Sequence, residues 1–491
     1  MVQRLKMYWS VTMNQNPSTR RRPVVALTGA SGYIGNNLLQ KLTKHADVIA
    51  LSRNIENKQD TEHITWRACD LYSLADAEQA LEGADFAVYL VHSMLPSAKL
   101  TQGSFEDMDV ILADNFAQAA NKQGLKQIVY LSGIIPKSRR LSRHLRSRLE
   151  VENILRAYGT PVTTIRAGLI VGPKGSSFPI LAKLVKRLPV MLLPKWTRKK
   201  THPIALPDVL YALDHSIGNA NLSGKAIDVG GPQTMTYKEM MRQTAQAMGK
   251  ERRMIDVPFL TVNLSRLWVS LTTNTPKEMV YPLIESLVHP MTAHPENMSE
   301  EISYGKIPFK EAARHSLQEE EKQGQQKTLP SMKLQPPSIQ HDVRSVQRIP
   351  LPEGKKADWV ALYYIEWLSR MVHPFLQVKE KNQSQYQIMF PITQQPVLEF
   401  TYAPERSTED RALFYITGGV FEDTKKNERG RLEFRQIPNQ QECIVAIHDY
   451  MPSLPWFIYK YTQAKAHLWV MHQFKKHLRT INPLSSEAMS I

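Results

Sequence analysis

The feature that most constrains this fold is a glycine-rich turn near the N-terminus, Leu27-Thr28-Gly29-Ala30-Ser31-Gly32-Tyr33-Ile34-Gly35. An apolar run precedes the turn and leucines at helical spacing follow it, so the sequence predicts a strand, a tight turn and a helix. Gly29 permits the turn, Gly32 lets the backbone approach a pyrophosphate, and Gly35 lets the helix pack on the strand. Because free N–H groups at a helix N-terminus bind phosphates, we expect a dinucleotide site here. Its expected residues are Thr28, Gly29, Ser31, Gly32, Tyr33, Ile34 and Gly35; the alternative is a glycine turn that serves packing only.

Strand-like and helical patterns alternate along the first half of the chain. Apolar strands separated by helices predict an α/β fold, a Rossmann-type doubly wound parallel sheet with helices on both faces. In such sheets the ligand binds at the carboxyl ends of the strands, so we read candidate residues from those ends. The predicted strands are 24–28, 48–51, 65–68, 86–91, 127–132, 162–166 and 226–229, with the main helices at 105–122 and 141–158.

The strand ends suggest which cofactor is bound. The second strand ends in Ser52 and Arg53, where an NAD site would carry an acidic residue, so we expect NADP with NAD as the alternative. A solvated arginine on a loop is the other interpretation of Arg53. After the third strand, Asp70 and Leu71 are placed to meet the adenine. The residues expected near the nicotinamide follow the fourth strand and are Val91, His92 and Ser93.

Composition excludes several other classes. The 491 residues are too many for one ordinary core, and a net charge of +16 suits nucleic acid, anionic membranes or phosphorylated ligands. The excess is not gathered in one lysine-rich tract, so we expect no nucleic acid. No apolar run reaches about 18 residues, which predicts no membrane span but leaves peripheral membrane contact open. Two distant cysteines favour a reducing compartment, the cytoplasm, and the histidines and cysteines lack metal-ligand spacing, so no metal is expected.

Four elements together resemble the extended short-chain dehydrogenase/reductase superfamily: the turn 28–35, Asp70-Leu71, Ser132, and Arg166-Ala167-Gly168. In that superfamily a serine works with a Tyr-x-x-x-Lys pair, in which the lysine lowers the tyrosine pKa. The matching positions here carry His144 and Arg148. The resemblance therefore implies that Ser132 and His144 orient and protonate the reacting oxygen and that Arg148 holds the cofactor, with Gly168 also near it. A purely structural role for these side chains is equally consistent with the changed pair.

Further motifs resemble one atypical branch, the NmrA-like regulators and a related NAD(P)-binding subunit of respiratory complex I. These motifs are 142–155, 166–171, 188–191, 194–198 and 202–205. Several members of this branch carry a second domain of unknown function. The resemblance implies NAD(P) binding and no particular substrate.

The C-terminal part predicts a separate α+β domain. A helix at 359–372 precedes strands at 385–392, 397–403, 412–421, 431–437 and 442–449, and a long helix closes the chain. This order resembles the helix-grip fold of START/SRPBCC proteins, which often enclose an apolar ligand. Alternation at 431–435 predicts one buried and one wet face of the sheet. The stripe Phe457, Tyr461, Ala464, Leu468 and Met471 is expected to pack on the sheet, with a membrane-lying basic helix as an alternative.

We expect a disordered basic tail at 1–22, a dinucleotide-binding domain at 23–300, a linker at 301–342 whose early part prolongs a helix, a helix-grip domain at 343–482 and a tail at 483–491. The apolar stretch 257–287 is expected to form core or a cap over the site. Together these features predict an NAD(P)-binding, atypical short-chain dehydrogenase/reductase-like protein, an oxidoreductase or isomerase on an apolar substrate. The alternative is a non-catalytic NADP(H)-sensing regulator or assembly factor.

Overall fold

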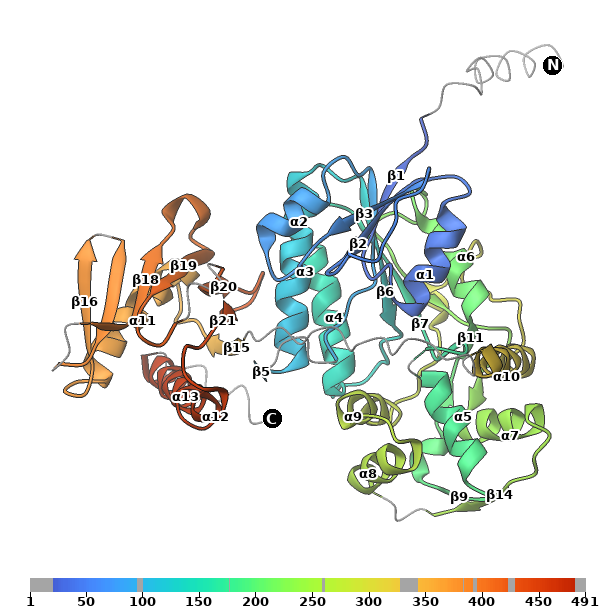
Figure 1. Ribbon diagram of the computed structural model, residues 1–491. Coiled ribbons are helices and arrows are strands. Elements are labelled where there is room, and N and C mark those ends of the chain that lie inside the picture. Colours follow the sequence, from blue (N-terminus) through green and yellow to red (C-terminus); the bar gives the residue numbers. More distant parts are fainter. Residues whose placement is uncertain are drawn as a thin grey trace, which may run out of the picture.

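The computed structural model describes residues 21–94, 100–175, 177–257, 261–326, 343–382, 384–391, 395–422 and 429–481. The predicted tails lie almost wholly outside these residues, and so does the later part of the predicted linker. The described residues form two domains that lie side by side (Figure 1).

The N-terminal domain is built on a seven-stranded parallel sheet. Across the sheet its strands are β12 (Ala226–Val229), β7 (Val162–Ala167), β6 (Gln127–Gly133), β4 (Phe86–Tyr89), β1 (Val24–Leu27), β2 (Asp47–Ser52) and β3 (Ile64–Ala68). All seven are the strands predicted from the sequence, so the doubly wound fold is confirmed. The strand order reverses between β1 and β4, and this switch point is where such sheets bind their ligands.

Helices cover both faces of this sheet (Figure 1). One face packs against α1 (Tyr33–Leu42) and α6 (Leu206–Ser216), and the other against α2 (Leu74–Ala80), α3 (Phe105–Lys122) and α4 (Arg143–Leu155). Serine side chains cap α2, α3 and α4 by accepting a first-turn N–H, which fixes where these helices begin. Helix α3 has the bounds that the sequence predicts.

A smaller lobe extends the N-terminal domain beyond the carboxyl edge of the sheet. Its elements are α5 (Ser177–Arg187), β9 (Val190–Leu193), α7 (Tyr237–Ala247), β14 (Arg253–Asp256), α8 (Val262–Thr273) and α9 (Lys277–Ser286). Val269 and Val280 are buried in this lobe, as expected for core, but Leu271 of α8 is 72% exposed. Helix α10 (Phe309–Gln326) falls within the predicted linker and packs on α7, with Phe309 and Ala313 in the same core.

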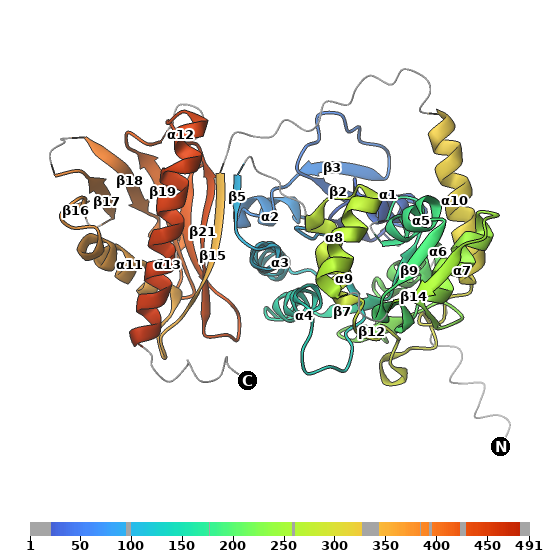
Figure 2. The same ribbon diagram turned by 90° about the horizontal axis from the view of Figure 1, so that it is seen from below.

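The C-terminal domain is an antiparallel sheet with helices on one face. Its strands are, in spatial order, β16 (Gln377–Asn382), β17 (Gln385–Met389), β18 (Pro396–Tyr402), β19 (Arg411–Gly418), β20 (Arg431–Gln436), β21 (Glu442–Tyr450) and β15 (Val343–Pro350). Helices α11 (Ala357–Met371) and α13 (Gln463–Ile481) lie across this sheet (Figure 2). The predicted α+β class of this domain is thereby confirmed.

The closing helix differs from its prediction. It breaks at Thr462 into α12 (Trp456–Tyr461) and α13, because Thr462 adopts a non-helical backbone with φ −117° and ψ −86°. The break changes the helical phase, so the predicted stripe does not share one face. Ala464 and Met471 pack in the core, whereas Phe457 is 73% exposed and Tyr461 50% exposed. Packing of the whole stripe on the sheet is therefore wrong.

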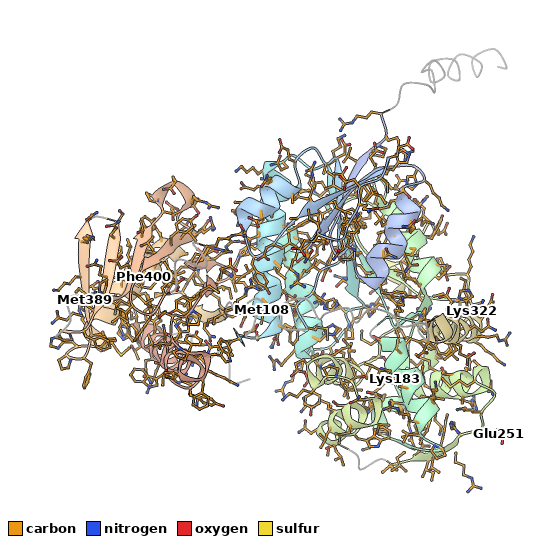
Figure 3. The ribbon with its side chains drawn as sticks, in the orientation of Figure 1. Met108, Lys183, Glu251, Lys322, Met389 and Phe400 are labelled. Atoms are coloured by element: carbon orange, nitrogen blue, oxygen red, sulfur yellow. The ribbon has the colours of Figure 1, made fainter. Side chains whose placement is uncertain are left out.

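The two domains share one sheet and one core. Strand β5 (Leu100–Gln102) belongs to the N-terminal domain and pairs in parallel with β15, so it forms the eighth strand of the C-terminal sheet (Figure 2). Met108 of α3, at the border between the domains, belongs to the same buried cluster as Val346 and Ile444 (Figure 3).

The expected wet face of the C-terminal sheet is buried, so that prediction is wrong. Arg431, Glu433 and Arg435 of β20 are only 7%, 2% and 3% exposed, because this face packs against α2, α3 and α4. Arg435 forms an ion pair with Asp114 of α3 and with Glu433 beside it. Buried charges are tolerated only when they are paired, and this interface pairs them across the two domains.

Arginines of β15 strengthen the same interface. Arg348 donates to Asp107 of α3 at 2.7 Å and forms a two-pronged contact with Glu150 of α4, both bonds at 2.9 Å. Desolvation alone would lower the pKa of Arg348, but these carboxylates raise it above its usual value. The contacts anchor the C-terminal domain to the helices that also carry the candidate site.

Candidate functional site

The glycine turn has the geometry that its sequence predicts. Gly29 has a φ of +64°, a conformation that disfavours other residues. A Cβ atom on Gly35 would lie 2.1 Å from the carbonyl oxygen of Gly29, so only glycine fits there. Helix α1 begins after Gly32, which offers no side chain to the first-turn N–H groups. The turn therefore presents free backbone donors to a pyrophosphate.

Thr28 fixes this turn to the neighbouring strand. Its Oγ1 donates to the Val88 carbonyl oxygen at 3.2 Å and accepts from the Leu90 N–H at 2.8 Å. The side chain is buried, so it acts on the cofactor site by positioning the turn at the strand switch point.

Tyr33 and Ile34 begin helix α1 and are both partly buried. The Tyr33 ring covers Gly172, where a Cβ atom would come within 2.4 Å of the Tyr33 hydroxyl. Burial raises the pKa of Tyr33 to about 12, so its phenol is neutral at physiological pH. The side chain thus braces the turn against the loop after β8 (Ile170–Val171).

The end of β2 fits a phosphate on the adenosine ribose. Arg53 is exposed, and no residue that the structure describes forms an ion pair with it. The adjacent Ser52 Oγ donates to the Asn54 carbonyl oxygen at 2.9 Å and lies 3.4 Å from the Ser31 hydroxyl. An exposed guanidinium that no described residue pairs suits a 2′-phosphate. The residues present therefore fit a dinucleotide, with pyrophosphate on the turn and Arg53 available for the 2′-phosphate.

Asp70 and Leu71 face the domain border. A carboxylate oxygen of Asp70 lies 3.6 Å from Arg344 of β15, and the same guanidinium stacks 3.7 Å above the Tyr72 ring. Leu71 is buried, and its carbonyl oxygen accepts from Asn115. Their contact with adenine stays a prediction, and the structure adds a contact of Asp70 with the other domain.

Residues 91–93, which follow β4, lie next to α3 and α4. The Ser93 N–H donates to Asp109 Oδ1 at 2.6 Å, Val91 is half-buried, and the His92 side chain is exposed. His92 is therefore a side chain that a ligand at this edge can reach.

Arg148 is held by an ion pair in the interior. Its Nη2 donates to Asp109 Oδ2 at 2.6 Å, and both side chains are buried. Burial works against its charge, but Tyr130 and Asp109 keep the pKa of Arg148 above its usual value. Arg148 therefore supplies a fixed positive charge to this site.

His144 lies one helical turn before Arg148 and is half-buried. Its Nδ1 lies 3.2 Å from the Ser286 hydroxyl of α9. Burial, the charge of Arg148 and the nearby His92 lower the pKa of His144 to about 3. His144 is thus neutral at physiological pH.

Ser132 and Gly168 complete the predicted set. The Ser132 hydroxyl is covered by protein and has no hydrogen-bond partner among the described residues. At Gly168 a Cβ atom would lie 2.3 Å from the carbonyl oxygen of His202, so this glycine is required for packing. The cofactor contact of Gly168 stays a prediction, as does the catalytic role of Ser132.

The sequence did not predict two residues of the site: Asp109, which pairs with Arg148, and Ser286, which contacts His144. Asp109 sits inside the otherwise apolar stretch of α3, where a buried acid signals a paired charge. Ser286 comes from a distant helix, and its sequence carries no signal for the contact with His144.

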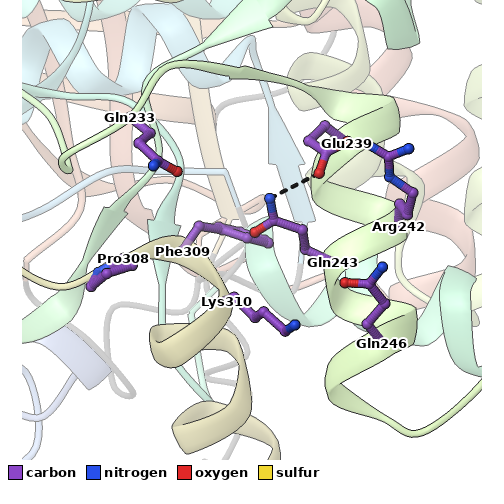
Figure 4. A pocket seen from close by; sticks show the side chains of 8 residues that line it. All are labelled: Gln233, Glu239, Arg242, Gln243, Gln246, Pro308, Phe309 and Lys310. Atoms are coloured by element: carbon purple, nitrogen blue, oxygen red, sulfur yellow. Dashed lines mark hydrogen bonds and ion pairs between the residues drawn. The ribbon is translucent and has the colours of Figure 1, made fainter.

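We also searched the described residues for a metal site and for other pockets near the predicted site. Among them no three His, Cys, Asp or Glu side chains gather as a metal site would require. A polar pocket of about 360 Å³ lies between α7 and the start of α10, where Gln243 donates to Glu239 (Figure 4). None of its lining residues belongs to the predicted site. Within the described ranges, none of the helices has the length and apolar character needed to cross a bilayer.

Comparison with known families identifies the N-terminal domain. Residues 29–183 match the family of NAD(P)H-binding domains. The auxiliary protein GraX of Staphylococcus aureus is 36% identical over 146 residues, covering 29% of this chain and 43% of that protein. A 40 kDa mitochondrial subunit of the NADH-ubiquinone oxidoreductase of Neurospora crassa is 21% identical over 47% of this chain and 61% of its own length.

A third relative is matched over more of its length. The ceramide reductase of Caulobacter vibrioides is 26% identical over 55% of this chain and 86% of that enzyme. Among solved structures, an NADPH-dependent quinone oxidoreductase of Escherichia coli superposes with a TM-score of 0.48 and 20% identity, over 59% of this chain and 99% of that one. The first two relatives are each covered over less than two thirds of their length.

The family match and the sequence relatives confirm the NAD(P)-binding resemblance of the N-terminal domain, while the resemblance of the C-terminal domain stays a prediction. The motif, the turn geometry and the family match agree on one ligand class. Residues 29–183 therefore form an NAD(P)H-binding domain, and the chain is an NAD(P)-binding protein similar to short-chain dehydrogenases/reductases.

Proposed function

We propose that this protein is an NADP(H)-dependent oxidoreductase that interconverts an alcohol and a carbonyl on an apolar substrate. The observation that carries the proposal is the neutral His144 beside the fixed charge of Arg148, at the strand edge that also holds the glycine turn. Bound NADP would supply or accept the hydride. The chain's own residues would bind and orient the substrate oxygen.

The proposal uses one tautomer of His144. The Ser286 hydroxyl lies 2.9 Å from the Pro282 carbonyl oxygen, 2.9 Å from the Ser142 hydroxyl and 3.2 Å from His144 Nδ1. When Ser286 donates its one proton to Pro282, His144 Nδ1 donates to Ser286, and Nε2 is unprotonated in the neutral ring. Such an Nε2 accepts a hydrogen bond from a substrate hydroxyl and orients it for hydride transfer. Because the pKa of His144 is lowered to about 3, the ring does not hold the substrate proton, which passes to water during oxidation and comes from water during reduction.

Arg148 is a positioning residue in this proposal. Its ion pair with Asp109 also fixes the Ser93 N–H, which donates to the other carboxylate oxygen. The positive charge keeps His144 unprotonated and favours negative charge on a nearby ribose or substrate oxygen. Ser132, near the carboxyl end of β6, would orient the same oxygen.

Two further observations support the cofactor and the substrate class. Arg53, which no described residue pairs, favours NADP over NAD. The ceramide reductase similarity favours a lipid-like carbonyl, because that relative is matched over most of its length. Both cysteines are free and buried, which supports a reducing compartment and hence the cytoplasm.

Turnover tests the proposal. Purified protein is assayed with NADPH and a panel of long-chain ketones, and with NADP and the matching alcohols, while cofactor binding is measured separately. We expect turnover with at least one pair, and a loss of about 100-fold or more in His144→Gln with NADPH binding retained. Equal turnover in His144→Gln would remove this residue from the mechanism.

A second candidate function rests on a different observation. The Ser132 hydroxyl and the Arg148 Nε are both covered by protein, which suits a domain that binds NADP(H) without reacting. Such a protein would be a non-catalytic sensor or assembly factor that reports the NADP(H) state. Tight NADPH binding without turnover of any panel member would favour this candidate.

A further inference from the structure

The C-terminal domain encloses a cavity of about 590 Å³ that is separate from the nucleotide site. It lies between the sheet and helices α11, α12 and α13, and Figure 3 labels one of its lining residues, Phe400. Six side chains illustrate its apolar wall: Tyr364, Ile388, Phe400, Ile416, Leu432 and Ile447. The volume falls within the range of pockets for drug-sized ligands.

The wall carries no formal charge. None of the described residues that line the cavity is Asp, Glu, Lys or Arg. Its one histidine, His467, lies 3.0 Å from the Ser345 hydroxyl through Nε2. Burial lowers the pKa of His467 to about 4, so this ring is neutral at physiological pH. An ionised group inside the cavity would therefore lack a counter-charge.

Apart from Thr462 and the tyrosine hydroxyls, the hydrogen-bonding groups of the lining gather at one end of the cavity, where β15, β5 and the start of α13 meet. They are Gln102, Ser345, Gln463 and His467. Gln463 Nε2 donates to the Tyr450 hydroxyl at 2.6 Å, and its Oε1 has no hydrogen-bond partner among the described residues. This end can bind a polar but uncharged headgroup.

One of these groups comes from the other domain. Gln102 ends β5, and its Nε2 donates to the Ala464 carbonyl oxygen of α13 at 2.9 Å. The next residue, Gly103, approaches β15 so closely that a Cβ atom there would lie 2.7 Å from the Val346 carbonyl oxygen. The N-terminal domain therefore builds part of the polar end, and the site is complete only when both domains are joined.

We propose that this cavity binds one uncharged molecule with a long apolar body, its hydroxyl, carbonyl or amide headgroup held at the Gln102–His467 end. Apolar contact with the wall drives binding, and the headgroup replaces its lost water contacts with the four polar side chains. A carboxylate or phosphate headgroup is excluded because its burial without a cation is costly. The proposal does not depend on the reaction proposed for the nucleotide site.

Two fluorescent polyenes that differ only in their headgroup test whether the cavity prefers an uncharged ligand. Full-length protein, delipidated and without NADPH, is titrated at pH 8 with parinaryl alcohol and with parinaric acid, which share one chain. We expect one alcohol bound per chain and an affinity for the ionised acid at least about tenfold weaker. Equal or tighter binding of the acid would overturn the proposal.

Variants place the probe in the cavity. Ile447→Trp and, separately, Leu398→Trp fill the cavity and should abolish alcohol binding, whereas Leu362→Trp, at a position 51% exposed on α11, should not. Gln102→Leu should weaken the alcohol about threefold to tenfold. NADPH binding and the melting temperature report which variants are folded. Unchanged alcohol binding in a folded cavity-filling variant would contradict the assignment.

Discussion

The nucleotide site of the N-terminal domain and the cavity of the C-terminal domain are lined by different chemical groups. The first uses backbone N–H groups, a left-handed glycine and an arginine that no described residue pairs, all suited to a charged ligand. The second uses apolar side chains and a few neutral polar groups. Charged donors bind an anionic ligand, whereas an apolar wall binds an apolar molecule that leaves water. The first site therefore selects a phosphorylated ligand and the cavity selects an uncharged one.

A layer of buried charges lies between them. It consists of arginines on the outer face of the C-terminal sheet and acidic residues on α3 and α4. The same sheet thus presents charge to the N-terminal domain and apolar side chains to the cavity. If this division is correct, variants in each region should affect their own ligand and leave the other unchanged.

The largest expected effect is on the charged layer. Arg435→Met removes the arginine that pairs with Asp114 and leaves that buried carboxylate without a counter-charge, while Glu433 loses one of its two arginine partners and keeps Arg411. We expect the free energy of unfolding to fall by about 3–5 kcal/mol in chemical denaturation. The control is Arg429→Met, whose ion pair with Asp76 is exposed and should contribute about 1 kcal/mol or less. Similar losses in both variants would refute the structural role of the layer.

The next effect concerns the glycine turn. Gly35→Ala places a methyl group against the Gly29 carbonyl oxygen and should weaken NADPH binding about 100-fold, while the alcohol probe still binds. Gly124→Ala is the control, because its φ of +68° gives strain in open space at the opposite end of the sheet. NADPH affinity that is unchanged in Gly35→Ala would contradict the site.

A smaller effect separates NADP from NAD. Arg53→Asp should weaken NADPH binding about tenfold or more, since it replaces the phosphate partner by a like charge, and should change NADH binding little. Rising salt should weaken NADPH binding in the wild type and leave the uncharged probe unaffected. If calorimetry shows the same loss for NADH and NADPH, Arg53 does not read the 2′-phosphate.

The smallest effect distinguishes two neutral histidines. Charge from Arg148 adds to burial in lowering the pKa of His144, whereas burial alone lowers that of His467. The double variant Asp109→Asn with Arg148→Met should raise the pKa of His144 and leave His467 unchanged, as followed by NMR of labelled histidines. Both values lie below that of an unfolded chain, about 6.5, so the unfolded state takes up protons first. Stability should accordingly fall as the pH drops from about 6.5 towards 4.

Sequence reasoning recovered what local patterns encode. The seven strands of the N-terminal sheet and helix α3 follow from apolar periodicity, and the turn follows from its glycines. It could not predict β5, because three residues are too few for a pattern and their strand conformation depends on pairing with β15. The sequence also led to the wrong prediction that the charged face of β20 is exposed to solvent. Alternation of polar and apolar residues cannot show that helices of another domain, which carry acidic residues, cover this face.

The candidate site divides in the same way. Gly29, Arg53, His144 and Arg148 were identified from motifs and strand ends. Their chemistry depends on Asp109 and Ser286, which tertiary packing brings from other helices. The cavity was expected only by resemblance, and its uncharged lining depends on contacts between residues from Gln102 to Val470.

The oxidoreductase proposal is tested by tracing the hydride. The protein is incubated with NADPH that carries deuterium at both C4 positions and with an apolar extract of cells, and products are examined by mass spectrometry. We expect deuterium on a carbon of an apolar alcohol, formed together with an equal amount of NADP and lost in His144→Gln. NADPH that binds with full occupancy but transfers no deuterium would contradict the oxidoreductase and leave the sensor as the function of this chain.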